Sequence, residues 1–298
     1  MHVKIPRVPL VATLIAVAAA AALLAAPAPL RDPANAGIAR IAATGRSPQP
    51  AATPAPTATA AAPGGTVPGA TPPGTRPPVV DHGPRTGNKV ALTFDADMTD
   101  AMRYQLRSGA VRSYANLKII DLLERERVPA TFFLTGKWVE QYPDVTRRLA
   151  ANPRFELANH TYGHLAFTAD CYGLPRIAER EMTADVARTF DVMAAYGGRQ
   201  TRYFRFPGLC HDRKALAALA PLGLTVVDGD VVSGDPFAKS WRPVVRASLA
   251  GVRPGSVIVL HVTEANAPMT DEALPHILAG LAERGLEPAP LSEVLGLG

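Results

Sequence analysis

Short, nearly unbroken apolar runs alternate along most of the chain with longer segments whose apolar residues recur every three or four positions. The short runs are typical of parallel strands buried on both faces. The longer segments predict amphipathic helices, and residues 117–127 (LKIIDLLERER) are a clear example. The predicted strands are residues 89–94, 130–134, 155–158, 203–206, 225–228 and 256–261, and the predicted helices are residues 117–127, 143–151, 182–196, 214–219, 243–249 and 274–284.

This alternation predicts an α/β domain with a parallel sheet. A (β/α) barrel and a doubly wound open sheet both fit the pattern. In both folds, ligands bind at the carboxyl ends of the strands. Polar residues at those ends are therefore candidates for a functional site.

Residues 47–84 break the pattern, because they consist almost entirely of Pro, Ala, Thr and Gly. The chain of 298 residues has 29 prolines, more than one compact domain holds, and the excess lies in this stretch. Proline favours extended, polyproline-like geometry. We therefore predict a disordered, Pro/Ala-rich linker over residues 37–85 and one folded domain over residues 86–298.

The N-terminus has the features of a secretory signal. Lys4 and Arg7 precede an uncharged apolar stretch at residues 10–26, and Ala-Asn-Ala at residues 34–36 fits a cleavage site. Residues 1–36 are therefore predicted to be a signal peptide. An uncleaved membrane anchor is the alternative, because the stretch is almost long enough to span a bilayer. Both interpretations predict an exported protein, periplasmic or secreted, that contacts a membrane only if the segment is retained.

Charge and cysteine content refine this picture. The net charge is +5, with no run of Lys and Arg, so nucleic-acid binding is not predicted. The two cysteines, Cys171 and Cys210, can form a disulfide in an oxidising compartment. Two buried free thiols are the alternative.

Five of the predicted strands end in polar side chains that can do chemistry. Because the carboxyl ends of parallel strands meet at one edge, these side chains are expected to converge. The candidates are Asp95 and Asp97, Asn159 with His160 and His164, Arg205, Asp230 and Asp235, and His261. Asp228 and His211 are weaker candidates.

Two histidines and two aspartates in this set suit a divalent metal. His160 and His164 are four residues apart, a spacing at which two imidazoles can share one face. Asp95 and Asp97 flank Ala96, so in an extended segment both carboxylates point the same way. Two imidazoles and one carboxylate leave an open position for water on Zn²⁺, and the second carboxylate can take a proton from that water. Each feature alone is weak, since an acid can simply end a strand in solvent.

Three further residues can complete a hydrolytic site. The imidazole of His261 has an ordinary pKa near neutral pH, so it can protonate a leaving group. Asp235 is expected to orient the His261 ring and favour its charged form, although Gly-Asp-Pro is also good turn chemistry. Arg205 is expected to pair with Asp95 and keep it ionised.

The ordered set of motifs resembles the NodB-homology polysaccharide deacetylases, carbohydrate esterase family 4. The resemblance covers residues 89–295, nearly all of the predicted domain. The motifs that carry it are Thr93-Phe94-Asp95, Ala130-Thr131-Phe132-Phe133 with Gly136, Asn159-His160-Thr161-Tyr162-Gly163-His164, Phe204-Arg205-Phe206-Pro207-Gly208, the segment 230–235, and Leu260-His261.

The resemblance implies a deformed (β/α) barrel that hydrolyses an N-acetyl group on a sugar. It implies a divalent ion, Zn²⁺ first and Co²⁺ or Mn²⁺ as alternatives. The implied roles are general base for Asp95, metal ligands for His160 and His164, and orientation of the base for Arg205. His261 would be the general acid, tuned by Asp235, and a backbone N–H near Gly208 would stabilise the oxyanion.

The sequence departs from the family pattern at four places. The first motif usually has two adjacent aspartates, base then metal ligand, but Ala96 occupies the second position. We predict that Asp97 binds the metal instead; a site with only two protein ligands is the alternative. Residues 99–116 form a longer link than usual, the third motif lacks its tyrosine, and Pro236 replaces an aromatic residue. These changes concern the substrate more than the reaction.

The leading functional hypothesis is therefore a metal-dependent deacetylase of an N-acetylated cell-envelope or extracellular glycan, such as peptidoglycan or a chitin-like polymer. An O-acetyl esterase remains open, because the same nucleophile attacks either acyl carbon. A degenerate carbohydrate-binding envelope protein is a second alternative, favoured by Ala96. A hydrolase of small amides on the same fold is the third.

Overall fold

The computed structural model describes residues 67–296. The predicted signal or anchor segment, residues 1–36, and the linker as far as residue 66 lie outside the described residues. Within residues 67–296, no helix combines the length and the apolar character needed to cross a bilayer.

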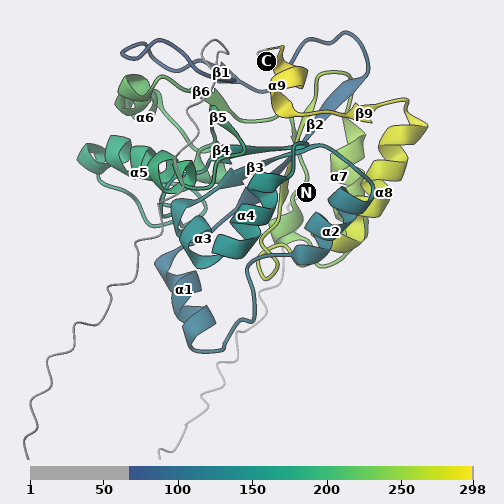
Figure 1. The fold of residues 1–298 in the computed structure, drawn as a ribbon, viewed down its shortest axis with the longest axis horizontal. Coiled ribbons are helices and arrows are strands. Elements are labelled where there is room, and N and C mark those ends of the chain that lie inside the picture. The colour runs from purple at the N-terminus through teal and green to yellow at the C-terminus, as the bar shows by residue number, and fades with distance from the viewer. Residues whose placement is uncertain (1–66, 297–298) are drawn as a thin grey trace, which may run out of the picture. The chain divides into compact units, whose positions relative to one another are not determined.

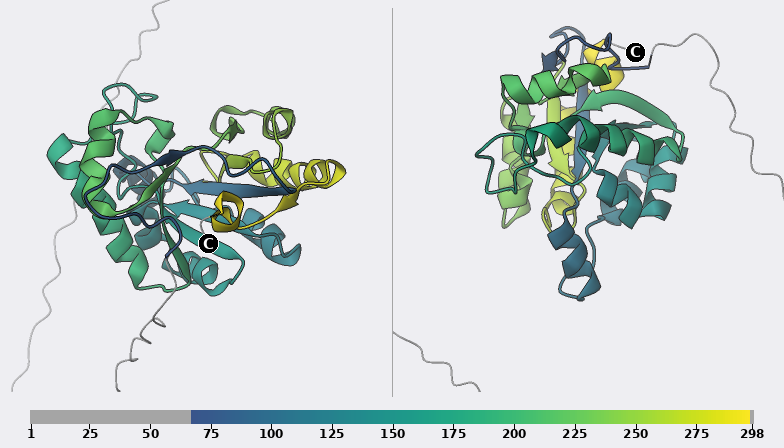
Figure 2. Two further views of the ribbon diagram at one scale, coloured as in Figure 1. Left: turned by 90° about the horizontal axis from the view of Figure 1, so that it is seen from above. Right: turned by 90° about the vertical axis from the view of Figure 1, so that its left-hand side faces the viewer.

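A curled, parallel sheet forms the centre of the domain, and helices cover its outer side (Figures 1 and 2). Eight strands follow the order β1-β6-β5-β4-β3-β2-β8-β7, β9 pairs with β2, and the ladders between these strands are parallel. The strands are β1 (Val79–Val80), β2 (Lys89–Ala96), β3 (Ala130–Leu134), β4 (Phe155–Asn159), β5 (Arg199–Phe204), β6 (Thr225–Val227), β7 (Val231–Val232), β8 (Val257–His261) and β9 (Glu287–Pro288). This half-barrel confirms the predicted deformed (β/α) barrel.

The helices largely follow the predicted pattern. They are α1 (Asp100–Arg107), α2 (Leu117–Arg125), α3 (Gly136–Gln141), α4 (Pro143–Ala151), α5 (Met182–Ala194), α6 (Arg213–Leu219), α7 (Trp241–Ala250), α8 (Thr270–Glu283) and α9 (Leu291–Leu295). Single 3-10 turns occur at Glu179–Glu181, Pro207–Leu209, Ala220–Leu222 and Asp235–Phe237. Helix α1 projects from one end of the domain, and β1 and α9 lie at the other (Figure 1).

The prediction misplaced strand β5 and missed helix α1. Strand β5 spans Arg199–Phe204 instead of residues 203–206, and its pairing with β4 shifts register between Leu157 and Asn159. Arg205 therefore lies just after the strand.

Helix α1 lies within residues 99–116, and Met102 is its one buried residue. An apolar stripe is therefore missing there, but the Thr99 side chain caps the helix by accepting a hydrogen bond from the Met102 N–H.

The folded domain also begins earlier than residue 86. Val79 and Val80 form β1 and pair with Val226 and Val227 of β6. Upstream of β1, the Arg202 N–H donates to the Pro68 carbonyl at 2.8 Å. The prolines around β1 concealed this strand, since proline is tolerated beside an edge strand although it cannot donate to the ladder. Residues 67–85, which the sequence assigned to the linker, therefore contribute to the folded domain.

Strands such as β2 are buried on both faces, and successive side chains along a strand point to opposite faces. This alternation directs the side chains of the catalytic candidates toward the interior of the half-barrel. Leu92 and Phe94 of β2 pack in the core cluster that contains α2, α4 and α8. Ala91, of opposite parity, packs with Phe133 and Leu291 inside the curl. Asp95 has the parity of Ala91, so its side chain faces the interior of the half-barrel.

A buried carboxylate at the opposite end of the interior fixes the C-terminal helix. Glu156 of β4 is fully buried and accepts hydrogen bonds from Thr131 Oγ1 at 3.1 Å and from the Ser292 backbone N–H at 3.1 Å. Ser292 Oγ also bonds it, and Arg199 Nη2 donates at 2.9 Å. These contacts satisfy a charge that would otherwise be costly to bury.

Replacing Glu156 with alanine is therefore expected to lower the free energy of unfolding by about 3 kcal/mol, because several buried donors lose their charged acceptor. Urea denaturation measures this change. Glu293→Ala is the matched control: Glu293 also pairs with a cation, Lys89, but its side chain is 47% exposed. Its loss should change stability by at most about 0.5 kcal/mol. Equal effects of the two substitutions would contradict a structural role for Glu156.

Candidate active site

One cavity at the carboxyl ends of the strands collects most of the residues that the sequence singled out. Its volume is about 270 Å³. Charged, imidazole and apolar side chains all contribute to its lining. The lining residues are Asp95, Asp97, His160, His164, Tyr172, Leu174, Gly208, Leu209, Val232, Gly234, Asp235, Pro236, Phe237, Val259 and His261.

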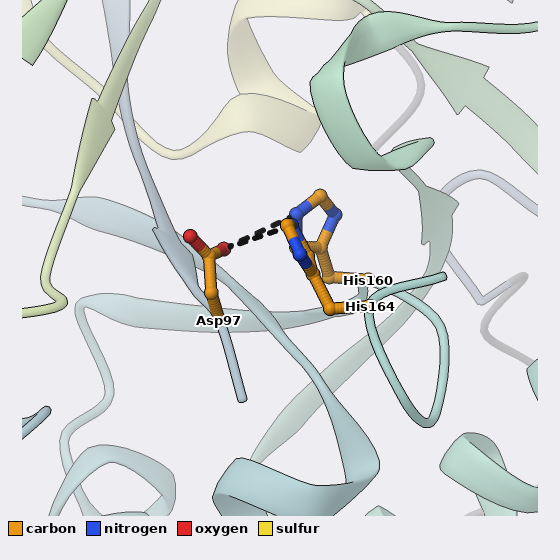
Figure 3. Close-up of side chains that lie close together, drawn as sticks. All are labelled: Asp97, His160 and His164. Atoms are coloured by element: carbon orange, nitrogen blue, oxygen red, sulfur yellow. Dashed lines mark ion pairs between the residues drawn. The ribbon is translucent and has the colours of Figure 1, made fainter. Parts of the chain in front are cut away.

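Asp97, His160 and His164 point toward one another (Figure 3). Asp97 Oδ1 lies 3.5 Å from His160 Nε2 and 3.3 Å from His164 Nε2. Ligands held tetrahedrally at about 2.0–2.1 Å from zinc lie roughly 3.3 Å apart, so these spacings match such a site. The predicted substitution of Asp97 for the usual ligand at position 96 therefore has the geometry that it requires, while Ala96 packs in the outer core.

The buried oxygen of Asp97 supports a cation at this point. Asp97 Oδ1 is buried and accepts no hydrogen bond within the described part of the chain. Burial alone would raise the pKa of Asp97, but His164, His160 and His261 together hold it well below its ordinary range. An ionised, unsatisfied oxygen that faces two imidazole nitrogens is stable only with a positive charge between them. The three residues therefore fit a divalent metal.

The hydrogen bond of His160 and the protonation state of His164 also suit ligation. The His160 Nδ1–H donates to the Arg205 carbonyl at 2.9 Å, because a carbonyl can only accept. This fixes the tautomer and leaves the Nε2 lone pair directed at Asp97. Burial is the main cause that lowers the pKa of His164 to about 4, with His160 and His261 adding to the effect. His164 is therefore neutral at physiological pH, as a metal ligand must be.

The loop after β4 places the two imidazoles. Asn159 Oδ1 accepts from the Thr161 N–H at 2.9 Å, and Thr161 Oγ1 accepts from the His164 N–H at 3.0 Å. Thr161 and His164 both have positive φ, 72° and 56°. Residues with a Cβ adopt this conformation rarely, and such strain is concentrated at functional sites. Asn159 thus acts by shaping the loop, with its Nδ2 bonded to the Val186 carbonyl.

Arg205 and Asp95 form a buried ion pair beside the triad. Arg205 Nη1 donates to Asp95 Oδ1 at 2.7 Å and to Thr93 Oγ1 at 2.9 Å. Arg205 Nε donates to the Val227 carbonyl at 3.0 Å, so the guanidinium is held from two sides. The other oxygen of Asp95, Oδ2, lies 3.8 Å from His160 Nε2 and lines the cavity. The predicted Arg205–Asp95 contact is therefore present.

His261 and Asp235 form a second pair across the cavity. His261 Nδ1–H donates to Asp235 Oδ1 at 2.8 Å, and the His261 backbone N–H donates to Asp235 Oδ2 at 2.8 Å. Ser233 and Thr270 also donate to Asp235. Burial would lower the pKa of His261, but Asp235, with Asp97 and Asp95 adding to its effect, raises that pKa to about 10. The same contacts hold the pKa of Asp235 low against its burial.

Not every candidate lies at the site. Asp230 binds Arg85 at 2.7 Å and the Val257 N–H at 2.8 Å, at the start of β8, so its role is structural. Asp228 pairs with His211 at 2.9 Å, and neither lines the cavity. Residues 99–116 also contribute nothing to the lining.

The two cysteines and Gly208 lie at the rim. Cys171 and Cys210 form a disulfide with Cα atoms 5.9 Å apart, so the free-thiol alternative was wrong. Gly208 lines the cavity with a φ of 60°. Tyr172 and Phe237 line it too, and no sequence signal pointed to them, because exposed aromatic residues in irregular loops belong to no periodic pattern.

Comparison with known proteins agrees with this geometry. The model of the polysaccharide deacetylase family matches residues 82–227, a span that includes the triad, Asp95 and Arg205 but ends before Asp235 and His261. The chitooligosaccharide deacetylase of Bradyrhizobium sp. (strain ANU 289) is 30% identical over 187 residues, which cover 59% of this chain and 82% of that protein.

Two solved structures have the same fold. A family 4 acetyl xylan esterase from Clostridium thermocellum, in complex with a cobalt ion, is 26% identical with a TM-score of 0.56, over 70% of this chain and 91% of that one. A family 4 pseudoenzyme from Bacillus anthracis is 20% identical with a TM-score of 0.59, over 74% of this chain and 69% of that one. From its sequence relatives, its fold and its site together, the chain belongs to the polysaccharide deacetylase family, carbohydrate esterase family 4.

Proposed function

We propose that this protein is a zinc-dependent hydrolase that removes acetyl groups from an N-acetylated glycan of the cell envelope or its surroundings. The observation that carries the proposal is the Asp97–His160–His164 triad in one cavity with two oriented pairs, Arg205–Asp95 and Asp235–His261. The ligand set of one carboxylate and two imidazoles suits Zn²⁺, and Co²⁺ or Mn²⁺ are alternatives of related chemistry. The name of the Bradyrhizobium relative supports a chitin-like or other N-acetylhexosamine chain.

Asp97, His160 and His164 would hold the cation. When bound, a divalent cation supplies a positive charge that polarises the acetyl carbonyl and makes a water in the site more acidic. Asp95 is placed to accept a proton from that water, since its Oδ2 faces the triad while Arg205 binds Oδ1. Arg205 fixes the direction of the Asp95 carboxylate.

His261 is placed to complete the reaction. Its Nδ1–H is engaged by Asp235, so Nε2 is free to carry a second proton, and Nε2 lies 3.9 Å from Asp97 Oδ2. The oxygen of the water that gives its proton to Asp95 bonds to the acetyl carbon, and the protonated imidazole donates its proton to the amide nitrogen as the C–N bond breaks, giving acetate and a free amine. The backbone near Gly208, which lines the same cavity, is positioned to assist the oxyanion.

The other candidate functions have weaker support. The fold neighbour with acetyl xylan esterase activity favours an O-acetyl ester as second substrate class. The pseudoenzyme neighbour shows only that this fold also occurs without activity. The corresponding hypothesis for this chain, a carbohydrate-binding protein without activity, conflicts with the presence of all five site residues: the three of the triad, the base and the acid.

We also propose export, which the disulfide supports because such bonds persist in oxidising compartments.

Acetate release from a panel of glycans tests the proposed function. The panel contains chitooligosaccharides, peptidoglycan, acetylxylan and a small acetamide, and the protein is first stripped of metal. We expect release from at least one N-acetylated glycan that returns on addition of Zn²⁺, Co²⁺ or Mn²⁺. Release from acetylxylan alone, or from the small acetamide alone, would replace the proposal by one of the alternatives. Release from nothing would favour a binding protein.

Removing the charge of Asp235 is expected to shift the pH profile. His261 acts while protonated, so activity falls as pH rises through its pKa. Asp235→Asn removes the main cause that raises this pKa, and the alkaline limb of kcat/KM should move to lower pH by at least about one unit. Ser233→Ala is the control, because it removes a hydrogen bond to Asp235 but keeps the charge. An alkaline limb that stays in place in Asp235→Asn would rule out His261 as the acid.

A further inference from the structure

Two exposed aromatic rings stand at the mouth of the active-site cavity. Tyr172 and Phe237 are each 74% exposed, and both line the cavity that holds the triad. Their ring centroids are 6.0 Å apart with an angle of 34° between the planes. Val232, 53% exposed, lies on the same rim. Large exposed apolar side chains are few on the described surface, so their concentration here indicates a binding surface.

The disulfide fixes Tyr172. Cys171 directly precedes it and is buried, while its partner Cys210 follows the Gly208–Leu209 turn of the opposite loop. Tyr172 has a φ of 51° and Leu209 a φ of 60°, a left-handed conformation that a residue with a Cβ keeps only when its surroundings hold it. A Cβ on Gly208 would lie 2.7 Å from Cys171 Sγ and 2.9 Å from Tyr172 Cδ2. The tyrosine ring therefore rests against bare backbone beside the disulfide.

Phe237 is fixed by the residue that orients His261. It ends the 3-10 turn Asp235–Phe237, and its N–H donates to the Gly234 carbonyl at 3.1 Å. Asp235, at the start of this turn, is anchored to His261, Ser233 and Thr270. The backbones of both aromatic residues are thus anchored beside the reacting groups, and their rings add no charge to the site.

A sugar ring is the ligand that fits this surface. One face of a pyranose ring presents C–H groups that are apolar and slightly positive, and the face of an aromatic ring is negative and apolar. A sugar stacked on the ring buries its apolar face while its hydroxyls stay in water. We propose that Tyr172 and Phe237 form an aromatic subsite for a pyranose of the glycan chain, and that the Cys171–Cys210 disulfide holds Tyr172 in place for it.

This inference rests on the proposed function for its substrate class, and it adds a requirement for length. A site that binds sugar beyond the reacting acetyl group selects an oligosaccharide over a single acetylated sugar. The sugar that stacks here does not react, so the contact stabilises the ground state and the transition state equally, and its loss should appear mainly in KM.

Binding and turnover of tetra-N-acetylchitotetraose test the subsite in the zinc-loaded protein. Tyr172→Ala and Phe237→Ala are each expected to weaken binding, measured by titration calorimetry, and to raise KM, by about tenfold, with kcat within about twofold of wild type. Tyr172→Phe, which keeps the ring, should restore both values. Tyr104→Ala is the matched control: Tyr104 is 65% exposed on α1 and does not line the cavity.

The double variant Cys171→Ser/Cys210→Ser tests the role of the disulfide. It should raise KM for the tetrasaccharide about as much as Tyr172→Ala does, and it should add little further effect in a Tyr172→Ala background. Tyr172→Ala removes only an exposed side chain, so it remains informative if the cysteine variant folds poorly.

The outcomes separate this inference from the proposed function. Acetate release that is equal in wild type, Tyr172→Ala and Phe237→Ala, with equal binding, overturns the subsite and leaves the deacetylase intact. Binding of the tetrasaccharide that depends on Tyr172, without acetate release from wild type, supports the subsite and overturns the deacetylase. Absence of both binding and release in wild type overturns the subsite as stated.

Discussion

Replacing Asp95 with asparagine is expected to lower kcat by about 10³-fold or more while zinc stoichiometry stays at one ion per chain. Asp95 Oδ2 faces the triad, but Oδ1 is held by Arg205 at 2.7 Å, and the carboxylate is not among the three grouped ligands. Its removal therefore takes away the proton acceptor and spares the metal. Losses of 10²–10⁴ are usual for a general base.

Asparagine is preferred to alanine for this test. Alanine at position 95 would leave the buried guanidinium of Arg205 without its charged partner, which costs several kcal/mol of stability. Asparagine keeps a side-chain oxygen for Arg205. Asp144→Asn is the control, because Asp144 also pairs with an arginine but its side chain is 89% exposed. Full activity in Asp95→Asn would show that Asp95 is not the base.

Replacing Asp97 with alanine should differ from Asp95→Asn in its effect on metal binding, because Asp97→Ala should lose both zinc and turnover. Asp97 contributes the one carboxylate of the triad, and its Oδ1 approaches both imidazoles. We expect zinc affinity to fall by about 10²-fold or more, since the loss of groups that merely support a ligand already costs 10–100-fold. Zinc content after dialysis against a weak chelator measures this.

The position of Asp97 can be tested against the usual family arrangement. Ala96 is fully buried and packs in the outer core cluster, so a carboxylate there would face apolar side chains instead of the cavity. The double variant Ala96→Asp/Asp97→Ala should therefore not recover zinc. Recovery of zinc and activity in that variant would show that residue 96 can reach the site, which would contradict its orientation toward the outer core.

The sequence predicted the fold and the two pairs at the site well, for a common reason. The central strands β2, β3, β4 and β8 are buried on both faces and read as short, mostly apolar runs, which places the polar residues at their carboxyl ends at the edge where the site forms. Asp95, His160 and His261 are recognisable in this way. The register of β2 with β8 then pairs Asp95 with His261 directly.

Other features depend on tertiary contacts that leave no pattern in the sequence. Strand β1 comprises only Val79–Val80 and is defined by its pairing with β6. Asp230 follows a predicted strand, yet its hydrogen bonds to Arg85 and Val257 place it away from the cavity. The rim formed by Tyr172 and Phe237 arises from a disulfide and a turn that join distant segments. Only the folded structure identifies such residues.

Zinc titration of the metal-free protein, followed by acetate release from an N-acetylated glycan, tests the central claim most directly. In wild type, activity should rise with added zinc and level off at one equivalent per chain, and at the same zinc concentrations Asp97→Ala should stay close to the background. Undiminished acetate release from rigorously metal-free wild type, or an Asp97→Ala variant that reaches wild-type activity at one equivalent, would contradict a metal site built on Asp97, His160 and His164.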